Sequence, residues 1–188
     1  MLDGPPMPDS LQRVRGHAAA ALDVRGGRTR LARLAQSGSA RAMLPRVHGA
    51  APEVVFLNTA GGLTGGDRLS YAVTLGPGAR ATATTQTAER AYASPGGRAG
   101  MEVRAEVGAG GRLDWLPQET ILFDRAALSR RTAIALAGDA ACLMVETLVL
   151  GRAAMGERVE TLQLSDHRTV TRDGVPVLIE PLDFGPAA

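Results

Sequence analysis

The chain contains no lysine, because all 21 of its lysine-or-arginine positions are arginines. A chain without lysine has no residue for Schiff-base catalysis, no lysine general base and no cation for a Walker-type phosphate loop. Aromatic residues are also scarce, at 3% of the 188 residues. The core therefore has to be built from alanine, valine, leucine and isoleucine. These absences exclude several classes of enzyme before any motif is considered.

Cysteine and histidine are also rare. The single cysteine, Cys142, lies in an apolar run and excludes an internal disulfide and a cysteine-based zinc site. The three histidines, His17, His48 and His167, show none of the spacings that place two metal ligands on one element. The sequence has no G-x-S-x-G motif. The usual residue spacings of zinc sites and motifs of serine or cysteine hydrolases are therefore missing.

The charges are nearly balanced, with 21 basic and 19 acidic residues. Arginines alternate with acids, as in residues 102–106 and 157–160, instead of forming a basic cluster with stacking aromatics. This pattern argues against nucleic-acid binding. The N-terminal segment has no apolar signal-peptide core, and no stretch approaches the ~20 apolar residues of a membrane helix. The sequence predicts a soluble, cytoplasmic protein with neither nucleic-acid nor membrane partners.

Short segments with alternating or β-branched residues dominate from residue 29 onward, and they predict an all-β architecture. The clearest of these segments are residues 54–57, 69–75, 80–85, 101–107 and 131–136. Gly76, Gly108 and Gly138 each lie where one such segment ends and another begins, at spacings of 32 and 30 residues. This period predicts stacked antiparallel sheets with solenoid-like winding. Irregular glycine turns in a β-sandwich are the alternative.

Helix is expected only in one or two short pieces. Residues 87–92 are predicted to form one or two helical turns, and residues 141–150 fit either a strand or a helix. Asp173 and Gly174 suit a type I′ turn in a closing hairpin. The sequence predicts a mobile leader at 1–24 and a single β domain at 25–188.

The most informative motif is NTAGGLTGGD at 58–67, which follows the apolar run 54–57. Gly61 and Gly66 have the spacing of a phosphate-binding loop, but Asp67 stands where that loop has its lysine. A carboxylate repels a triphosphate, so this loop is not a nucleotide site. Paired glycines instead indicate a backbone that turns sharply or is closely approached.

Polar residues interrupt two apolar segments. Gln118 and Glu119 lie in LPQETILFD at 116–124, and Glu146 lies in LMVETLVL at 143–150. A buried carboxylate has to find partners or shift its pKa. Each acid therefore forms an internal ion pair, faces outward from a strand, or lines a polar pathway. A small β-fold hydrolase using Glu119 with Asp124 is the enzyme alternative, but no histidine or nucleophile lies nearby in the sequence.

Four segments, in order, resemble the UreD (UreH) family of urease accessory proteins. They are LNTAGGLTGGD at 57–67, TTQTAERAY at 84–92, LPQETILF at 116–123 and GRAAMGE at 151–157. The resemblance implies a mostly antiparallel β fold stacked in a helical fashion. It also implies a non-catalytic chaperone that assembles with UreF-type and UreG-type (GTPase) proteins on apo-urease, into which nickel is inserted. A structural β-solenoid adaptor without metal contact is the other alternative.

The resemblance also implies roles for individual residues. We expect a partner-binding or structural loop at Asn58, Thr59, Gly61, Gly62, Gly65, Gly66, Asp67, Gln118 and Arg152. We place a transient nickel path at Asp67, Glu119, Glu146 and Glu157, with no tightly bound cofactor. Weak oxygen ligands suit an ion in transit, since thiolate or imidazole ligands would retain it. Family members continue beyond the region matching 180–182, so we expect a missing C-terminal part and an open sheet edge.

Overall fold

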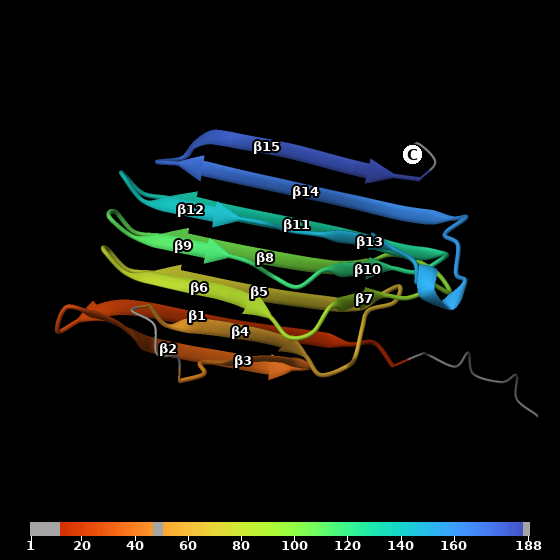
Figure 1. Ribbon diagram of the computed structural model, residues 1–188, viewed down its shortest axis with the longest axis horizontal. Helices are drawn as coiled ribbons and strands as arrows, with labels where there is room; N and C mark the ends of the chain where they lie inside the picture. The colour runs from red at the N-terminus through yellow and green to blue at the C-terminus, as the bar shows by residue number, and fades with distance from the viewer. Residues whose placement is uncertain (1–11, 47–50, 186–188) are drawn as a thin grey trace, which may run out of the picture.

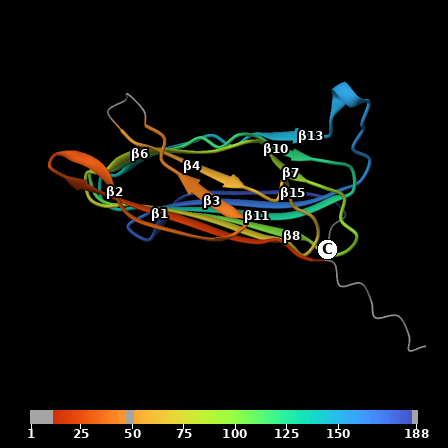
Figure 2. The same cartoon turned by 90° about the horizontal axis from the view of Figure 1, so that it is seen from below.

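The computed structural model describes residues 12–46 and 51–185, and these residues form two facing layers of β-strands (Figures 1 and 2). One layer is a seven-stranded sheet, here called the wide sheet. In spatial order its strands are β15 (Val175–Phe184), β14 (Leu162–Arg172), β11 (Ala126–Leu136), β8 (Ala99–Val107), β5 (Arg68–Leu75), β1 (Arg15–Arg25) and β2 (Arg28–Gly38).

The facing layer consists of two shorter sheets. The five-stranded sheet contains β12 (Ala141–Met144), β9 (Arg112–Trp115), β6 (Arg80–Thr85), β4 (Glu53–Asn58) and β3 (Ala40–Met43). The three-stranded sheet contains β13 (Leu148–Leu150), β10 (Thr120–Leu122) and β7 (Glu89–Ala91). A 3-10 turn, η1 (Ala153–Met155), follows β13.

The chain winds as a solenoid, in which each full coil adds one strand to each of the three sheets. The coils are β5–β6–β7, β8–β9–β10 and β11–β12–β13, stacked side by side in Figure 1. The corners of successive coils fall at the regularly spaced glycines of the sequence. There the Gly108 N–H donates to the Leu75 carbonyl oxygen at 2.8 Å, and the Ala137 N–H donates to the Val107 carbonyl oxygen at 2.9 Å. The prediction of an all-β, solenoid-like fold is confirmed.

The direction of strand pairing differs from the prediction. Strands of successive coils pair in parallel, as β5 does with β8 and β8 with β11. Coils that wind in one direction have to present neighbouring strands in the same direction. Antiparallel pairs occur at the ends of the described sheets, where a hairpin reverses the chain: β1 with β2, β14 with β15, and β3 with β4.

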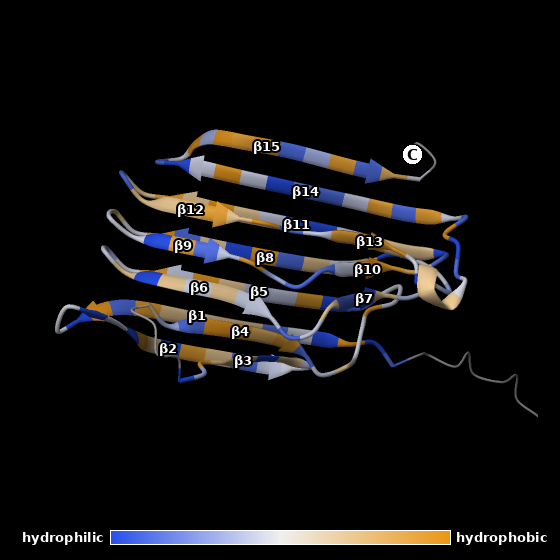
Figure 3. Cartoon of the chain, in the orientation of Figure 1, coloured by the Kyte–Doolittle hydropathy of each residue, from blue (hydrophilic) through white to orange (hydrophobic). Residues whose placement is uncertain are grey.

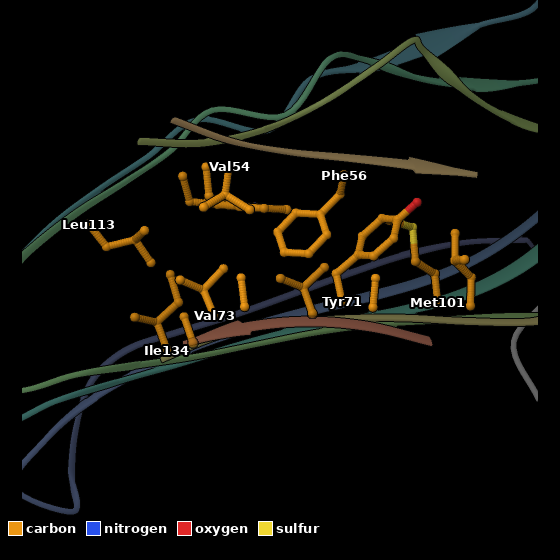
Figure 4. Close-up of a cluster of buried hydrophobic side chains, with 14 of the residues drawn as sticks. Val54, Phe56, Tyr71, Val73, Met101, Leu113 and Ile134 are labelled. Carbon is orange, nitrogen blue, oxygen red and sulfur yellow. The ribbon is translucent and has the colours of Figure 1, made fainter. Parts of the chain in front are cut away.

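The core lies between the two layers. Apolar side chains alternate along the strands with polar ones, which is visible as the alternating colours of Figure 3. In β5, Leu69, Tyr71, Val73 and Leu75 are buried while the residues between them are not. The few rings lie at the centre, where Phe56 stacks on Tyr71 with ring centroids 4.8 Å apart (Figure 4). Alanines fill much of the remaining interior, as the composition predicts.

Two predictions of local structure are wrong. Residues 15–24 of the expected leader form most of β1, which pairs with β2 on one side and β5 on the other; residues 1–11 lie outside the described part of the chain. The short helix expected at 87–92 is instead strand β7, because residues 89–91 pair with β10. Tertiary pairing overrides local helix preference over so few residues.

The structure agrees with the other local predictions. Residues 141–150 form two strands, β12 and β13, interrupted at Glu146. Asp173 and Gly174 have φ values of 49° and 81°, so the type I′ turn is confirmed, and it joins β14 to β15. Strand β15 forms one edge of the wide sheet, with Val175 64% and Ile179 68% exposed. None of the described residues belongs to a helix long and apolar enough to cross a membrane.

Candidate functional site

The four sequence segments that carry the resemblance meet at one end of the solenoid. We call residues 58–67 the glycine loop. Leu63 of this loop pairs with Ala91 of β7. Ala91 pairs with Leu122 of β10, and the Gly151 N–H, at the start of the fourth segment, donates to the Leu122 carbonyl oxygen at 2.8 Å. Each segment therefore contributes to one continuous ladder. We call this region, consisting of residues 58–67, 89–92, 120–123 and 148–152, the end sheet; it lies at the right of Figure 1.

The glycine loop packs too tightly against its neighbours to accept side chains at two positions. A Cβ on Gly62 would lie 2.4 Å from Cε2 of Tyr92, and the φ of Gly62 is 155°. A Cβ on Gly65 would lie 2.1 Å from Oγ of Ser94 and 2.3 Å from the Gly96 carbonyl oxygen. Close approach of the 89–97 segment, rather than ligand binding, therefore explains glycine at these two positions. Gly61 and Gly66 also have positive φ values, of 77° and 91°.

Asp67 closes the glycine loop. Its side chain is buried, and its two oxygens accept backbone N–H groups from Val14 and Thr64, each at 2.8 Å. Asn58 fixes the start of the loop, since its amide Nδ2 donates to the Gly62 carbonyl oxygen at 3.4 Å. Thr59 anchors the loop to the residue before β3 through its hydroxyl, which donates to the Ser39 carbonyl oxygen at 2.9 Å. The Asp67 carboxylate is thus engaged by the protein itself.

The outward side of the end sheet carries a stacked group of three side chains, Tyr92, Phe123 and Arg152, which we call the aromatic–arginine stack. The rings of Tyr92 and Phe123 are nearly parallel, with centroids 5.0 Å apart, and the Arg152 guanidinium lies 4.7 Å from the Phe123 ring centroid. Tyr92 remains 43% exposed. Tyrosine and arginine are enriched among residues that dominate binding energy at protein interfaces.

Glu157 holds Arg152 in place on the stack. The Arg152 Nε–H donates to Oε2 of Glu157 at 3.0 Å, and the Asp124 N–H donates to Oε1 at 3.3 Å. The hydrogen bond from Arg152 lowers the pKa of Glu157 below its ordinary value. Asp124 is occupied in a similar way, because one of its oxygens accepts N–H groups from Glu160 and Thr161 at 2.9 Å each. Glu157 and Asp124 therefore shape the end sheet.

Glu146 belongs to a group of buried charges, which we call the buried ion cluster: Arg130, Glu146, Asp166 and Arg168. One Glu146 oxygen accepts from Nε1 of Trp115 and from the Thr132 hydroxyl, each at 2.9 Å, and the other from Nε of Arg168 at 2.7 Å. Asp166 bridges the two arginines, at 2.5 Å from Arg130 and 2.6 Å from Arg168. Of the alternatives weighed for Glu146, the structure therefore shows the internal ion pair.

Burial alone would raise the pKa of Glu146, but Arg130 and the hydrogen bonds from Arg168, Trp115 and Thr132 more than offset it and lower the pKa. The cluster joins β11 and β14 of the wide sheet to the facing layer. Its carboxylates are fully supplied with donors, so they lock the two layers together.

The remaining predicted residues lie near the end sheet without converging on an ion site. Glu119 is half-buried, and its carbonyl oxygen accepts the Glu89 N–H at 3.0 Å. Gln118 is exposed, and its N–H donates to the Thr85 hydroxyl at 3.0 Å. His48 lies outside the described residues. Within the described part of the chain, no three histidine, cysteine, aspartate or glutamate side chains are grouped to hold a metal ion.

Glu89 is an unusual carboxyl group that the sequence did not single out. It faces the interior beside Tyr71, and its oxygens accept the Asn58 amide at 3.2 and 3.4 Å and, at one oxygen, the Arg90 N–H at 3.3 Å. Burial raises the pKa of Glu89 to about 7. The residue lies in the matched segment 84–92, but the predicted helix gave no reason to point it inward. The alternation of β7 is the signal that would have placed it.

We expect Glu89 to make the stability of the protein depend on pH. Its folded-state pKa of about 7 exceeds the ordinary value of 4.5, so the native state binds the extra proton between these pH values. Its stabilising contribution is complete below pH 4.5 and is lost as the pH rises through 7. Relative to Glu89→Gln, the wild type should lose roughly 2 kcal/mol of unfolding free energy between pH 5 and 8. Urea unfolding of both proteins measures this difference, and parallel pH profiles would contradict it.

Comparison with known proteins gives consistent matches across most of the chain. The model of a family described as "UreD urease accessory protein" matches residues 14–188. A protein named "Urease accessory protein UreD" from Cereibacter sphaeroides is 63% identical over 177 residues, which cover 94% of this chain and 64% of the relative. Proteins with the same name from Paracoccus denitrificans and Rhizobium etli are 52% and 49% identical, over 96% and 90% of this chain and 63% and 62% of their own lengths. The chain thus spans a little under two thirds of the curated relatives it matches.

Proposed function

Because the chain belongs to the UreD family of urease accessory proteins, we propose that it serves as a maturation factor for urease. In this proposal it acts without catalysing a reaction, as a cytoplasmic chaperone that binds apo-urease together with UreF-type and UreG-type accessory proteins. Nickel is the cargo of that assembly and passes in transit, with no tightly bound cofactor in this chain. The family match over residues 14–188 supports the maturation role.

The convergence of the four matched segments carries the proposal that the end sheet is the partner surface. Segments far apart in the chain, from Leu63 to Gly151, are linked there by backbone pairing. They also present the aromatic–arginine stack, whose Tyr92 is 43% exposed and whose Arg152 side chain is 54% exposed. Exposed aromatic and arginine side chains fixed by stacking lose little conformational entropy on binding.

The adaptor alternative, without metal contact, is favoured by one observation. Asp67, Glu146 and Glu157 are all held by donors from the protein, so none offers a free carboxylate to an ion in this arrangement. Of the four acids assigned to a nickel path, Glu119 has no side-chain partner among the described residues. A chain that binds partners while the ion passes elsewhere is consistent with these contacts.

Co-expression with a urease operon that lacks its own copy of this protein tests the proposed function. We expect the wild-type chain to raise urease activity and the nickel content of the purified urease. Arg152→Ala and Tyr92→Ala should lower activation about tenfold or more, because hot-spot truncations cost about 2 kcal/mol or more. Arg104→Ala is the matched control, since the Arg104 side chain is 70% exposed on the opposite layer and, among the described residues, forms an ion pair with Glu102 alone.

Folding has to be measured alongside activation. The variants should keep the melting temperature of the wild type within a few degrees, so that lost activation reports lost binding. A soluble wild-type chain that leaves urease activity unchanged would contradict the maturation role. Full activation by both stack variants would instead show that the end sheet is not the partner surface.

A further inference from the structure

Arg125 adopts a backbone conformation that its side chain disfavours. Its φ is 60°, and apart from Asp173 in the hairpin turn, every other described residue at positive φ is a glycine. Asparagine and aspartate tolerate this region, but a long side chain there is destabilising. Glycine would satisfy the backbone at this position with less strain. An arginine at a positive φ therefore indicates that its side chain has a role.

The hydrogen bonds that Arg125 forms with other described residues come from its backbone. Its N–H donates to the Thr161 carbonyl oxygen at 2.7 Å, and its carbonyl oxygen accepts the Ser94 N–H at 2.9 Å. The guanidinium is 74% exposed and reaches Asp124 only at 3.7 Å. Arg125 faces Oδ2 of Asp124, while the other oxygen, Oδ1, accepts the N–H groups of Glu160 and Thr161. A long, exposed ion pair of this kind contributes little to stability, so the contacts among the described residues give little structural reason for arginine at this position.

Arg125 is one of the residues that line a cavity of about 430 Å³. Its lining includes Ser94, Gly97, Arg98, Arg125, Thr161 and Gln163. Arg98 is exposed and forms no ion pair within the described ranges 12–46 and 51–185. None of the described residues that line the cavity is acidic. The lining thus combines two exposed arginines and one uncharged amide, and the Asp124 carboxylate, which lies 3.7 Å from Arg125, is not part of it.

The cavity is continuous with the end sheet. Ser94 follows Tyr92 by two residues, and Arg125 follows Phe123 by two, so the strands that build the aromatic–arginine stack run directly into it. Ala93 also pairs with Ala126 across this junction. A partner that covers the stack would extend over the cavity.

We propose that this cavity, with Arg98 and Arg125 as its ligands, binds a carboxylate from an acidic segment of a partner protein. Planar guanidinium groups match the two oxygens of a carboxylate, and arginine is preferred over lysine for such paired contacts. A phosphate is a poorer fit, because phosphate sites add converging free backbone N–H groups. Here the Gly96 N–H is already used by the Ser94 hydroxyl at 3.1 Å. Only the assignment of the carboxylate to a urease-maturation partner rests on the proposed function.

Binding can be tested on the isolated chain, independently of urease. A hexaglutamate peptide is titrated into the isotope-labelled protein, with hexaglutamine and inorganic phosphate as the comparison probes. We expect hexaglutamate to shift the amide signals of Gly96, Gly97 and Arg125, and hexaglutamine to leave them unchanged. Arg98→Ala and Arg125→Gly should each weaken hexaglutamate binding about tenfold or more, whereas Arg104→Ala should not.

Arg125→Gly separates a binding role from a structural one. Because glycine suits a φ of 60°, this variant should keep the wild-type melting temperature or raise it by up to about 4 °C while losing the peptide. A lower melting temperature would show that the arginine stabilises the fold and would overturn the inference. Unchanged hexaglutamate binding in both arginine variants would also overturn it, as would tighter binding of phosphate than of hexaglutamate. None of these results depends on whether the chain activates urease.

Discussion

Replacing Glu146 with alanine should lower the free energy of unfolding by about 3–5 kcal/mol, the largest effect that we expect from a single substitution. The substitution leaves the guanidinium groups of Arg130 and Arg168, which are 3% and 9% exposed, sharing the single buried carboxylate of Asp166 within the described part of the chain. It also removes the acceptor of the Trp115 and Thr132 hydrogen bonds. Buried donors without a partner cost far more than the same groups at the surface.

The matched control is Glu102→Ala. Glu102 also pairs with an arginine, at 2.7 Å, but the side chains of Glu102 and Arg104 are 38% and 70% exposed. An exposed pair of this kind contributes about 0–1 kcal/mol, so this variant should stay close to the wild type. Urea unfolding gives both values. Equal losses in the two variants would mean that the buried ion cluster does not hold the two layers together.

A second large effect is expected at Gly65. An alanine Cβ there would lie 2.1 Å from Oγ of Ser94 and 2.3 Å from the Gly96 carbonyl oxygen, so the glycine loop has to separate from the 94–97 turn. We expect a loss of about 2–4 kcal/mol and a fall in melting temperature of about 5–10 °C. The loop holds Leu63 against Ala91, so partner binding by the end sheet should be lost together with stability.

Gly96→Ala serves as the control for Gly65→Ala, since it makes the same chemical change in the turn against which Gly65 packs. A Cβ on Gly96 meets no atom within 4 Å, and Gly96 does not have a positive φ. Its stability should change by no more than about 0.5 kcal/mol. If Gly65→Ala were tolerated as well as Gly96→Ala, close packing of the glycine loop would not be the reason for glycine at position 65.

The coiled architecture was predictable because its signal is local. Gly76, Gly108 and Gly138 recur at nearly equal intervals, and the segments between them alternate in the manner of strands. The direction of pairing was not predictable from those residues, since a strand shows the same alternation beside a parallel or an antiparallel neighbour. The difference arises from how distant segments wind around each other.

The candidate site was predictable in part. The paired glycines marked a closely packed loop, and the structure gives the reason at Gly62 and Gly65. The inward direction of the Glu89 side chain was not predicted, because its segment was assigned to a helix. The partners of Glu146 were not predictable either, because they lie at distant positions in the chain: 115, 130, 132 and 168. The strained backbone of Arg125 has no sequence signal, because the turn that imposes it is fixed by Ser94 and Thr161.

The central claim is that residues 58–67, 89–92, 120–123 and 148–152 act as one recognition surface. Hydrogen exchange of the chain, alone and mixed with apo-urease and its UreF-type and UreG-type proteins, tests this claim most directly. The account predicts slower exchange on mixing in the end sheet, with little change in the hairpin turns at Gly26–Gly27 and Asp173–Gly174 at the other end of the strands. Protection confined to those turns or to the outward face of the wide sheet, with the end sheet unchanged, would contradict it.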